Sequence, residues 1–211
     1  MLQEFRSRLY VVATAGADLA RLAATLEAAQ AATLLVMADA STPLTATLAR
    51  PLVELAQSKD IAALINGDAQ LARTLRADGV HVPWSKDVVA QYAEAREVLG
   101  NRYIVGVDVG RTRHDAMDLA EAGADYIGFG IPAHVEDRDA AAARRRELVG
   151  WWSEIFEVPC VAFDVESADE AIALASVGAD FIAMRADFDL SSPEQLAHDI
   201  AAASPQPEAT T

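Results

Sequence analysis

The sequence predicts a single closed (β/α)8 barrel of the TIM type, and three observations support this α/β fold. Short apolar segments of strand length alternate with segments of helical periodicity along the whole chain of 211 residues. Strands joined by helices pair in parallel, because tight turns join antiparallel strands. A helix–hinge–strand pattern also recurs, with its hinges at 77–79, 123–125 and 178–180. Eight such units in a short chain favour a closed barrel over the alternative, an open doubly wound sheet.

The clearest unit lies between residues 104 and 130. Its first segment, 104–107, is rich in β-branched residues, as is typical of a strand buried on both faces. Residues 114–122 carry apolar side chains at helical spacing, and Gly123 follows where a left-handed helix cap favours a residue without Cβ. Residues 126–129 form a second apolar strand, which completes a parallel strand–helix–strand crossover.

The other elements follow the same alternation. The strands are predicted at 9–13, 33–38, 61–65, 79–82, 104–107, 126–129, 158–163 and 181–184. The helices are predicted at 18–32, 43–59, 69–76, 86–99, 114–122 and 139–156, followed by two that begin after Ser167 and Ser192. Serine is a favoured N-cap residue, and Pro193 occupies a favoured first helical position.

Composition predicts one domain and a small-molecule ligand. No linker divides the chain, so residues 1–203 are expected to form the barrel and residues 204–211 a disordered tail of proline and small polar residues. The net charge of −15 argues against nucleic acid and anionic membranes as partners. Cys160 is the single cysteine, and no apolar run approaches a membrane span, so the cytoplasm is the expected location.

Candidate site residues follow the strands, because active sites of such barrels form at the C-terminal strand ends. The predicted catalytic residues are Asp108, after the fifth strand, and His134, after the sixth. The predicted ligand-binding residues are Asn66, His81, Trp84, Asp164 and Arg185. Converging carboxylates either bind a cation or raise one another's pKa. The basic residues that would offset them are Arg111, Arg138 and Arg185.

Some of these residues also have a purely structural interpretation. Asp68 is placed to cap a helix, and a histidine in a buried strand, such as His81, is typical of a hydrogen-bonded core residue. Trp84 suits the packing of a loop. The arginines at 144–146 are typical of a solvated helix face, and the tryptophans at 151–152 indicate either packing against the barrel or a homo-oligomer contact. The residues interpreted as structural alone are Asp125, Asp180 and Cys160.

Several segments share one further pattern: LYVV at 9–12, LINGDAQLARTLRADGVHV at 64–82, IVGVDVGRTRHDAMDLAEAGADYIGFG at 104–130, and VPCVAF and GADFIAM near the end. Together they resemble the thiamine phosphate synthase/TenI family over about residues 9–187. The resemblance implies a small (β/α)8 barrel. It also implies a synthase that uses Mg²⁺ to join a pyrimidine methyl diphosphate to a thiazole phosphate, with loss of pyrophosphate.

The metal and base positions of that family are replaced here. The second strand and its end, residues 35–40, carry none of the family's basic residues. Gly67 and Lys86 stand at the positions of the two metal-binding aspartates. The substitute ligands for Mg²⁺ implied by the resemblance are therefore the adjacent Asp68 and Asp87.

The phosphate positions are replaced as well. Asp108 stands at a family serine, residues 131–136 replace a loop that carries Thr and Lys, and Asp164 begins the segment that replaces a Gly-Gly pair. Glycine pairs let backbone N–H groups approach a phosphate. Asp164 is therefore expected to put a negative charge where a phosphate would sit.

Three hypotheses for the function follow. The first is a divergent family member, linked to thiamine biosynthesis, that has kept the barrel and lost the synthase site. The second is an active thiamine phosphate synthase or TenI-type thiazole tautomerase that uses Asp68, Asp87 and Arg185 as substitutes, with His134 as a general acid or base. The third is an oligomeric scaffold, suggested by the tryptophans at 151–152 and their arginine-rich helix.

Overall fold

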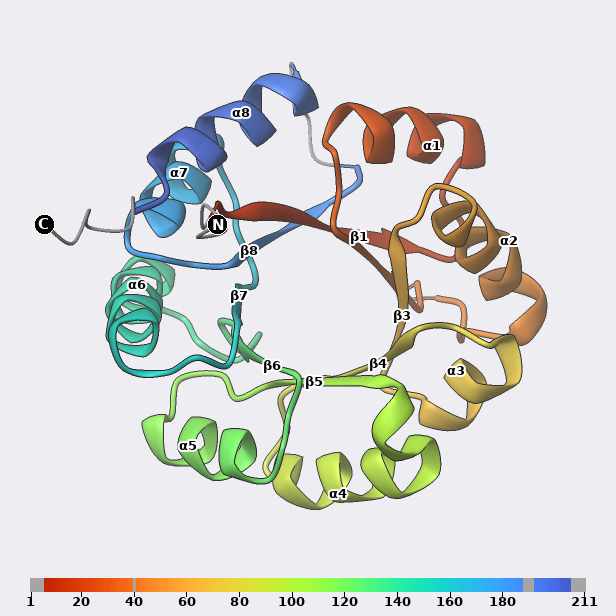
Figure 1. Cartoon of the computed structure of the whole chain (residues 1–211), viewed down its shortest axis with the longest axis horizontal. Helices are drawn as coiled ribbons and strands as arrows, with labels where there is room; N and C mark the ends of the chain where they lie inside the picture. Colours follow the sequence, from red (N-terminus) through yellow and green to blue (C-terminus); the bar gives the residue numbers. More distant parts are fainter. Residues whose placement is uncertain (1–5, 40, 188–191, 206–211) are drawn as a thin grey trace, which may run out of the picture.

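The computed structural model describes residues 6–39, 41–187 and 192–205, and these form a closed barrel (Figure 1). Its eight strands are parallel and lie in sequence order, with β1 paired to β8. The strands are β1 (Arg8–Thr14), β2 (Thr33–Met37), β3 (Ala62–Asn66), β4 (Gly79–Val82), β5 (Ile104–Asp108), β6 (Tyr126–Phe129), β7 (Cys160–Ala162) and β8 (Phe181–Arg185). The predicted fold is confirmed, and the β1–β8 pairing excludes the open sheet.

The helices form a ring outside the strands, and each follows one strand in sequence (Figure 1). They are α1 (Leu19–Ala28), α2 (Ala46–Gln57), α3 (Ala69–Leu75), α4 (Val88–Leu99), α5 (Arg113–Glu121), α6 (Arg138–Ile155), α7 (Ala168–Ser176) and α8 (Pro193–Ala203), with a 3-10 turn at Gly100–Arg102. Pro193 opens α8 after the Ser192 cap, as predicted. Within the described ranges, none of these helices has the length and apolar character needed to span a membrane.

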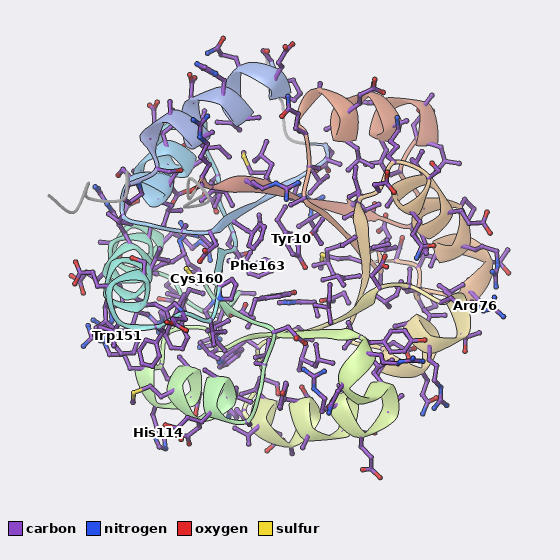
Figure 2. All side chains as sticks on the ribbon, viewed as in Figure 1. Tyr10, Arg76, His114, Trp151, Cys160 and Phe163 are labelled. Carbon is purple, nitrogen blue, oxygen red and sulfur yellow. The ribbon has the colours of Figure 1, made fainter. Side chains whose placement is uncertain are left out.

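Side chains alternate between two cores along each strand, because the strand period is two. The larger core lies between the strands and the helices. The smaller core fills the barrel interior, where Figure 2 shows Tyr10 and Phe163 inside the ring of strands. Glycine provides room for these rings: a Cβ at Gly106 would lie 1.9 Å from Cζ of Tyr126, and one at Gly128 would lie 2.8 Å from Cε2 of Phe163.

The three repeated hinges fasten neighbouring strands in the same way. The carboxylates of Asp78, Asp125 and Asp180 each accept the backbone N–H at or near the start of the preceding strand, at distances of 2.8 Å. The predicted structural role of Asp125 and Asp180 is thus confirmed. The repeated pattern in the sequence corresponds to a repeated strand clamp at the N-terminal face of the barrel.

The ordered chain continues past the predicted end of the domain. Ser204 is 3% exposed, and its Oγ accepts the backbone N–H of Ser7 at 2.7 Å. Ser7 Oγ donates in turn to the carbonyl of Ala179. These bonds join the segment before β1 to the segment before β8 and to the residue after α8. The sequence places Ser204 in the disordered tail because its side chain is small and polar, whereas in the structure this side chain is buried and bonded to Ser7. The rest of the predicted tail, 206–211, lies outside the described residues.

The arginine run at 144–146 is the clearest correction to the sequence interpretation. Arg145 is fully buried, whereas a solvated face was predicted. It shares the buried face of α6 with Ala141, Leu148, Val149 and Trp152. Arg145 donates to the carbonyl of Phe163 and forms an ion pair with Glu170 of α7.

The two tryptophans pack within the subunit. Trp152 is fully buried and donates its indole N–H to the carbonyl of Val158 at 2.7 Å. Trp151 lies on the outside of α6, where Arg113 stacks over its ring at 4.5 Å (Figure 2). The packing interpretation is therefore confirmed for Trp152, and the homo-oligomer contact stays a prediction for the half-buried Trp151.

Candidate functional site

A cavity of about 300 Å³ opens at the C-terminal ends of the strands. Five of the predicted site residues line it: Asn66, His81, Asp108, Asp164 and Arg185. Asn66, Asp108 and Arg185 are the last residues of β3, β5 and β8, where an inward side chain faces the barrel mouth. We call this space the mouth cavity.

Two carboxylates dominate one wall of the mouth cavity. Oδ1 of Asp108 accepts the backbone N–H groups of Gly110, at 2.7 Å, and Gly130, at 3.1 Å. Oδ2 of Asp164 accepts the N–H of Ile131 at 2.7 Å. A Cβ at Gly130 would lie 2.4 Å from Oδ2 of Asp108 and 3.0 Å from Oδ2 of Asp164, so both carboxylates converge on this glycine. Three backbone donors at the mouth are therefore already bound to the protein's own anions.

Burial, together with the neighbouring acid, shifts the pKa of the Asp108 carboxyl. Desolvation raises the pKa of the Asp108 carboxyl from 3.8 to about 7, and the negative charge of Asp164 adds to the rise. The two backbone N–H groups and the guanidinium of Arg145 oppose this rise without cancelling it. Asp108 can therefore gain or lose a proton near neutral pH.

A buried hydrogen-bond chain ends at the floor of the mouth cavity. The hydroxyls of Tyr10 and Tyr126 lie 2.9 Å apart, and the Tyr126 hydroxyl lies 2.8 Å from Nδ1 of His81. If Nδ1 of His81 were the donor, one of the two buried tyrosine protons would have no acceptor among the described residues. Satisfying both buried hydroxyl protons requires Tyr10 to donate to Tyr126 and Tyr126 to donate to His81, which leaves only the imidazole proton at the cavity without a partner in the described residues. The remaining proton of the imidazole is then on Nε2.

His81 is neutral over the whole physiological range. Its side chain is 3% exposed, and burial lowers its pKa from 6.5 to about 3. Its ring packs against Phe163 at 4.6 Å and stacks with Tyr126. The interpretation of His81 as a hydrogen-bonded core histidine is confirmed, and the residue also borders the cavity.

The arginines of the mouth cavity are already paired. Arg138 forms an ion pair with Glu166 at 3.0 Å, and Arg185 forms one with Asp187 at 2.8 Å. Both pairs are largely solvent-exposed, so each contributes little to stability. Their geometry nevertheless reduces the positive charge that these guanidiniums present to the cavity.

Arg145 supports the acidic wall from behind. Its contacts with the carbonyl of Phe163 and with Glu170 hold the chain on either side of Asp164, and Glu170 also accepts the N–H of Glu166 at 2.9 Å. Asp164 adopts a left-handed conformation with φ of 57°. Because few non-glycine residues adopt this region, the contacts of Arg145 help to hold Asp164 in place.

Two of the predicted site residues line a neighbouring cavity and not the mouth cavity. Trp84 and His134 pack ring against ring at 5.2 Å and line a cavity of about 340 Å³ with Arg111 and Arg144. Trp84 also covers Gly110, whose added Cβ would lie 2.7 Å from the indole ring. We call this second space the rim cavity. His134 therefore does not line the mouth cavity with Asp108.

The residues proposed as Mg²⁺ ligands do not fit a metal site at the mouth. Asp68 caps α3, accepting the N–H of Leu71 at 2.8 Å, and it lines a separate cavity beside α3 and α4. Asp87 is exposed at the start of α4. Over the described ranges, no group of three or more His, Cys, Asp or Glu side chains is arranged to hold a metal ion. Mg²⁺ is usually held by one or two carboxylates together with waters and substrate phosphates, and Asp68 and Asp87 do not line a common cavity in which they could share it.

Comparison with known proteins identifies the family. The family described as thiamine monophosphate synthase matches residues 9–188, which is most of the chain. The chain belongs to this family. A thiamine-phosphate synthase from Azoarcus is 34% identical over 194 residues, which cover 90% of this chain and 93% of that protein. The resemblance inferred from the sequence is thereby confirmed.

Other relatives match over a shorter stretch. A thiamine-phosphate synthase from Erythrobacter litoralis is 40% identical over 141 residues, which cover 66% of this chain and only 65% of that protein. Among solved structures, thiamine phosphate pyrophosphorylase from Pyrococcus furiosus is 20% identical, with a TM-score of 0.73 over 93% of this chain and 96% of that one. 3-Hexulose-6-phosphate synthase from Salmonella typhimurium is 16% identical, with a TM-score of 0.64 over 92% and 98% of the two chains. These structural likenesses concern the fold alone.

Proposed function

We propose that this member of the thiamine monophosphate synthase family has lost synthase activity and retains the mouth cavity for a ligand without a phosphate group. The setting remains thiamine biosynthesis. One observation carries the proposal: Asp108 and Asp164 occupy the backbone N–H groups of Gly110, Gly130 and Ile131. These are donors of the kind that bind a phosphate in other barrels.

Electrostatics supports the same conclusion. Asp164 is exposed, so a phosphate oxygen about 4 Å from its carboxylate would be repelled by about 1–4 kcal/mol. Positive charge would have to offset this cost, but Arg138 and Arg185 are engaged by acidic partners. Charge stabilisation of the departing pyrophosphate would be missing for the same reason.

The mouth cavity still has groups suited to acid–base chemistry. Asp108 titrates near neutral pH, and Asp164 stands beside it. A carboxyl group with a pKa close to the working pH is efficient in proton transfer. Asp108 therefore remains the candidate catalytic residue for any proton transfer on a bound ligand.

A direct assay of the synthase reaction tests the proposal. The purified chain is incubated with the pyrimidine methyl diphosphate, the thiazole phosphate and Mg²⁺, and thiamine phosphate and pyrophosphate are both quantified. The Azoarcus relative serves as the positive control under the same conditions. We expect no product above the enzyme-free reaction. Thiamine phosphate formed at a rate near that of the control would refute the proposal.

The rim cavity favours a second candidate function, an active enzyme that holds the phosphate of its ligand outside the mouth. Arg111 has no ion-pair partner among the described residues, and His134 and Arg144, which is paired with Glu147 at 3.0 Å, add two more basic side chains. Acidic side chains are absent from this lining. If the synthase assay gives product, Arg111→Gln should reduce it about tenfold or more, since a guanidinium–phosphate contact is charge-assisted. Arg146→Gln, an exposed change in the same helix as Arg144, is the matched control.

A further inference from the structure

We propose that the mouth cavity binds a flat organic cation, an aromatic ring that carries an amidinium or ammonium group, between the carboxylates of Asp108 and Asp164. This inference rests on the proposed function, because a phosphate-free mouth is its starting point. Three features of the cavity support it, namely two open carboxylate oxygens, an aromatic floor and the charge of the lining, and a fourth, an unpartnered N–H, shows that the floor is open to a ligand or to water.

The first feature is the pair of open oxygens. The hydrogen bonds of Asp108 use Oδ1, and the hydrogen bond of Asp164 uses Oδ2. The other oxygen of each carboxylate has no donor within the described part of the chain. These two oxygens are also not sealed in the core. Among the described residues, the side-chain polar atom that is both buried and without a partner is Nε of Arg145. Two open acceptors on neighbouring carboxylates suit a group with at least two N–H donors and a positive charge.

The second feature is independent of the acids. His81 is 97% buried, and its Nε2 has no partner in the described residues, whereas its Nδ1 is held by Tyr126. The hydrogen-bond chain from Tyr10 places a proton on Nε2, so a donor borders the cavity at its floor. This donor is open to the cavity, so water or an acceptor atom of a ligand binds it, whereas an amidinium or ammonium group binds the carboxylates.

The third feature is the aromatic and apolar floor. Phe163 is 8% exposed and lines the cavity beside His81, and Leu35 and Ala183 complete its apolar base. A volume of about 300 Å³ is at the small end of ligand sites, which suits one ring rather than two. An aromatic face also attracts a cation above it. The apolar floor therefore favours a flat ring, and the carboxylates of Asp108 and Asp164 favour a positively charged group on it.

The charge of the lining favours a cation over an anion. Its acidic side chains are Asp108, Asp164 and Glu166, and its basic side chains are Arg138 and Arg185. Both arginines are paired, and Asp187 adds a further negative charge beside Arg185. Arg145 is committed to Glu170 behind the wall. Each arginine in the described part of the lining therefore already faces a carboxylate, which an anionic ligand would have to displace.

Calorimetry with three small probes of one shape tests the proposal. Benzamidine is the cation, benzamide its neutral analogue and benzoate its anionic analogue. At pH 8 we expect benzamidine to bind, benzamide to bind at least tenfold more weakly, and benzoate to give no heat. Asp164→Asn should weaken benzamidine at least tenfold, whereas Asp169→Asn, an exposed change in α7, should leave it unchanged.

A pH series adds a second readout. Affinity for benzamidine should rise about ninefold between pH 6 and pH 8, because the ionised fraction of Asp108 rises from about 10% to about 90% across its pKa. Asp108→Asn should abolish this rise. The other groups that face Asp108 are Asp164, Glu166, Arg138, Arg145, Arg185, Tyr126 and His81. Burial keeps His81 neutral and Tyr126 protonated between these pH values, so neither produces the rise.

Three results would overturn the proposal. One is the absence of benzamidine binding, and another is equal binding of benzamide. The third is displacement of benzamidine by millimolar Mg²⁺ with the same dependence on Asp108 and Asp164, which would assign a metal site instead. The proposed function fails on a different result, the formation of thiamine phosphate, so the two failures are distinguishable.

Discussion

Replacing Asp108 by asparagine should stabilise the protein at pH 8 and leave its stability nearly unchanged at pH 4. The carboxyl has a pKa of about 7 in the fold and an ordinary value of 3.8. Between these pH values the folded state holds a proton that the unfolded chain has released, so ionisation disfavours the fold. Stability is therefore lost as pH rises from about 4 to about 7, and the loss is complete above that range. Asparagine carries no charge and escapes this loss.

The structure also sets the magnitude. A pKa rise from 3.8 to about 7 corresponds to about 4 kcal/mol, which is a ceiling. Asp108 is only partly buried, so we expect about 2 kcal/mol at pH 8, or about 4–8 °C in Tm. The asparagine oxygen can still accept the N–H groups of Gly110 and Gly130, so the local hydrogen bonds are retained.

Urea unfolding followed by circular dichroism at pH 4, 6 and 8 measures this effect. Glu154→Gln, an exposed carboxylate-to-amide change in α6, is the control and should stay within about 0.5 kcal/mol at each pH. A difference between Asp108→Asn and the original protein that does not vary with pH would refute the reasoning. So would destabilisation at pH 8.

Three further outcomes are expected. Arg145→Met should lower the free energy of unfolding by about 3–5 kcal/mol in urea titrations, because it leaves the buried partners of the guanidinium unpaired, whereas Arg146→Met should change it by less than about 0.5 kcal/mol. Gly106→Ala should cost about 1–3 kcal/mol in the same titrations, since its Cβ would meet the ring of Tyr126 at 1.9 Å. Histidine-labelled NMR should show no titration of His81 between pH 5 and pH 8, and a midpoint near 6.5 would contradict the buried neutral ring.

The barrel could be predicted from the sequence because its signals are local. Each strand is a short apolar run and each helix has its own periodicity, so the alternation is visible without knowledge of the packing. The recurring hinges reflect a recurring physical device, the carboxylates of Asp78, Asp125 and Asp180 that bind the preceding strands. Closure followed from the number of units and is confirmed by the β1–β8 pairing.

The mouth residues were partly predictable for the same geometric reason. Asn66, Asp108 and Arg185 end their strands, and every C-terminal strand end meets the same cavity in a closed barrel. His134 and Trp84 also follow strands, but they sit in loops. The path of a loop depends on packing that the sequence does not encode locally, and these two residues pack against each other over the rim cavity.

Arg145 was misread because a run of arginines suggests a solvated face. The signal that could have identified it is its register: it lies four residues after Ala141 and three before Leu148, on the apolar stripe of α6. The hydrogen-bond chain through Tyr10 and Tyr126 was missed for a different reason. It joins β1, β4 and β6, and contacts at such sequence separation appear only once the strands are paired.

The central claim is that carboxylates occupy the place of a phosphate at the mouth, and one calorimetric comparison tests it most directly. Thiazole phosphate, with Mg²⁺, is titrated into the original protein and into Asp164→Gly. The variant removes the charge at a left-handed position that glycine adopts readily. We predict no binding to the original protein up to millimolar ligand and measurable binding to the variant. Micromolar binding to the original protein, unchanged in Asp164→Gly, would contradict the account.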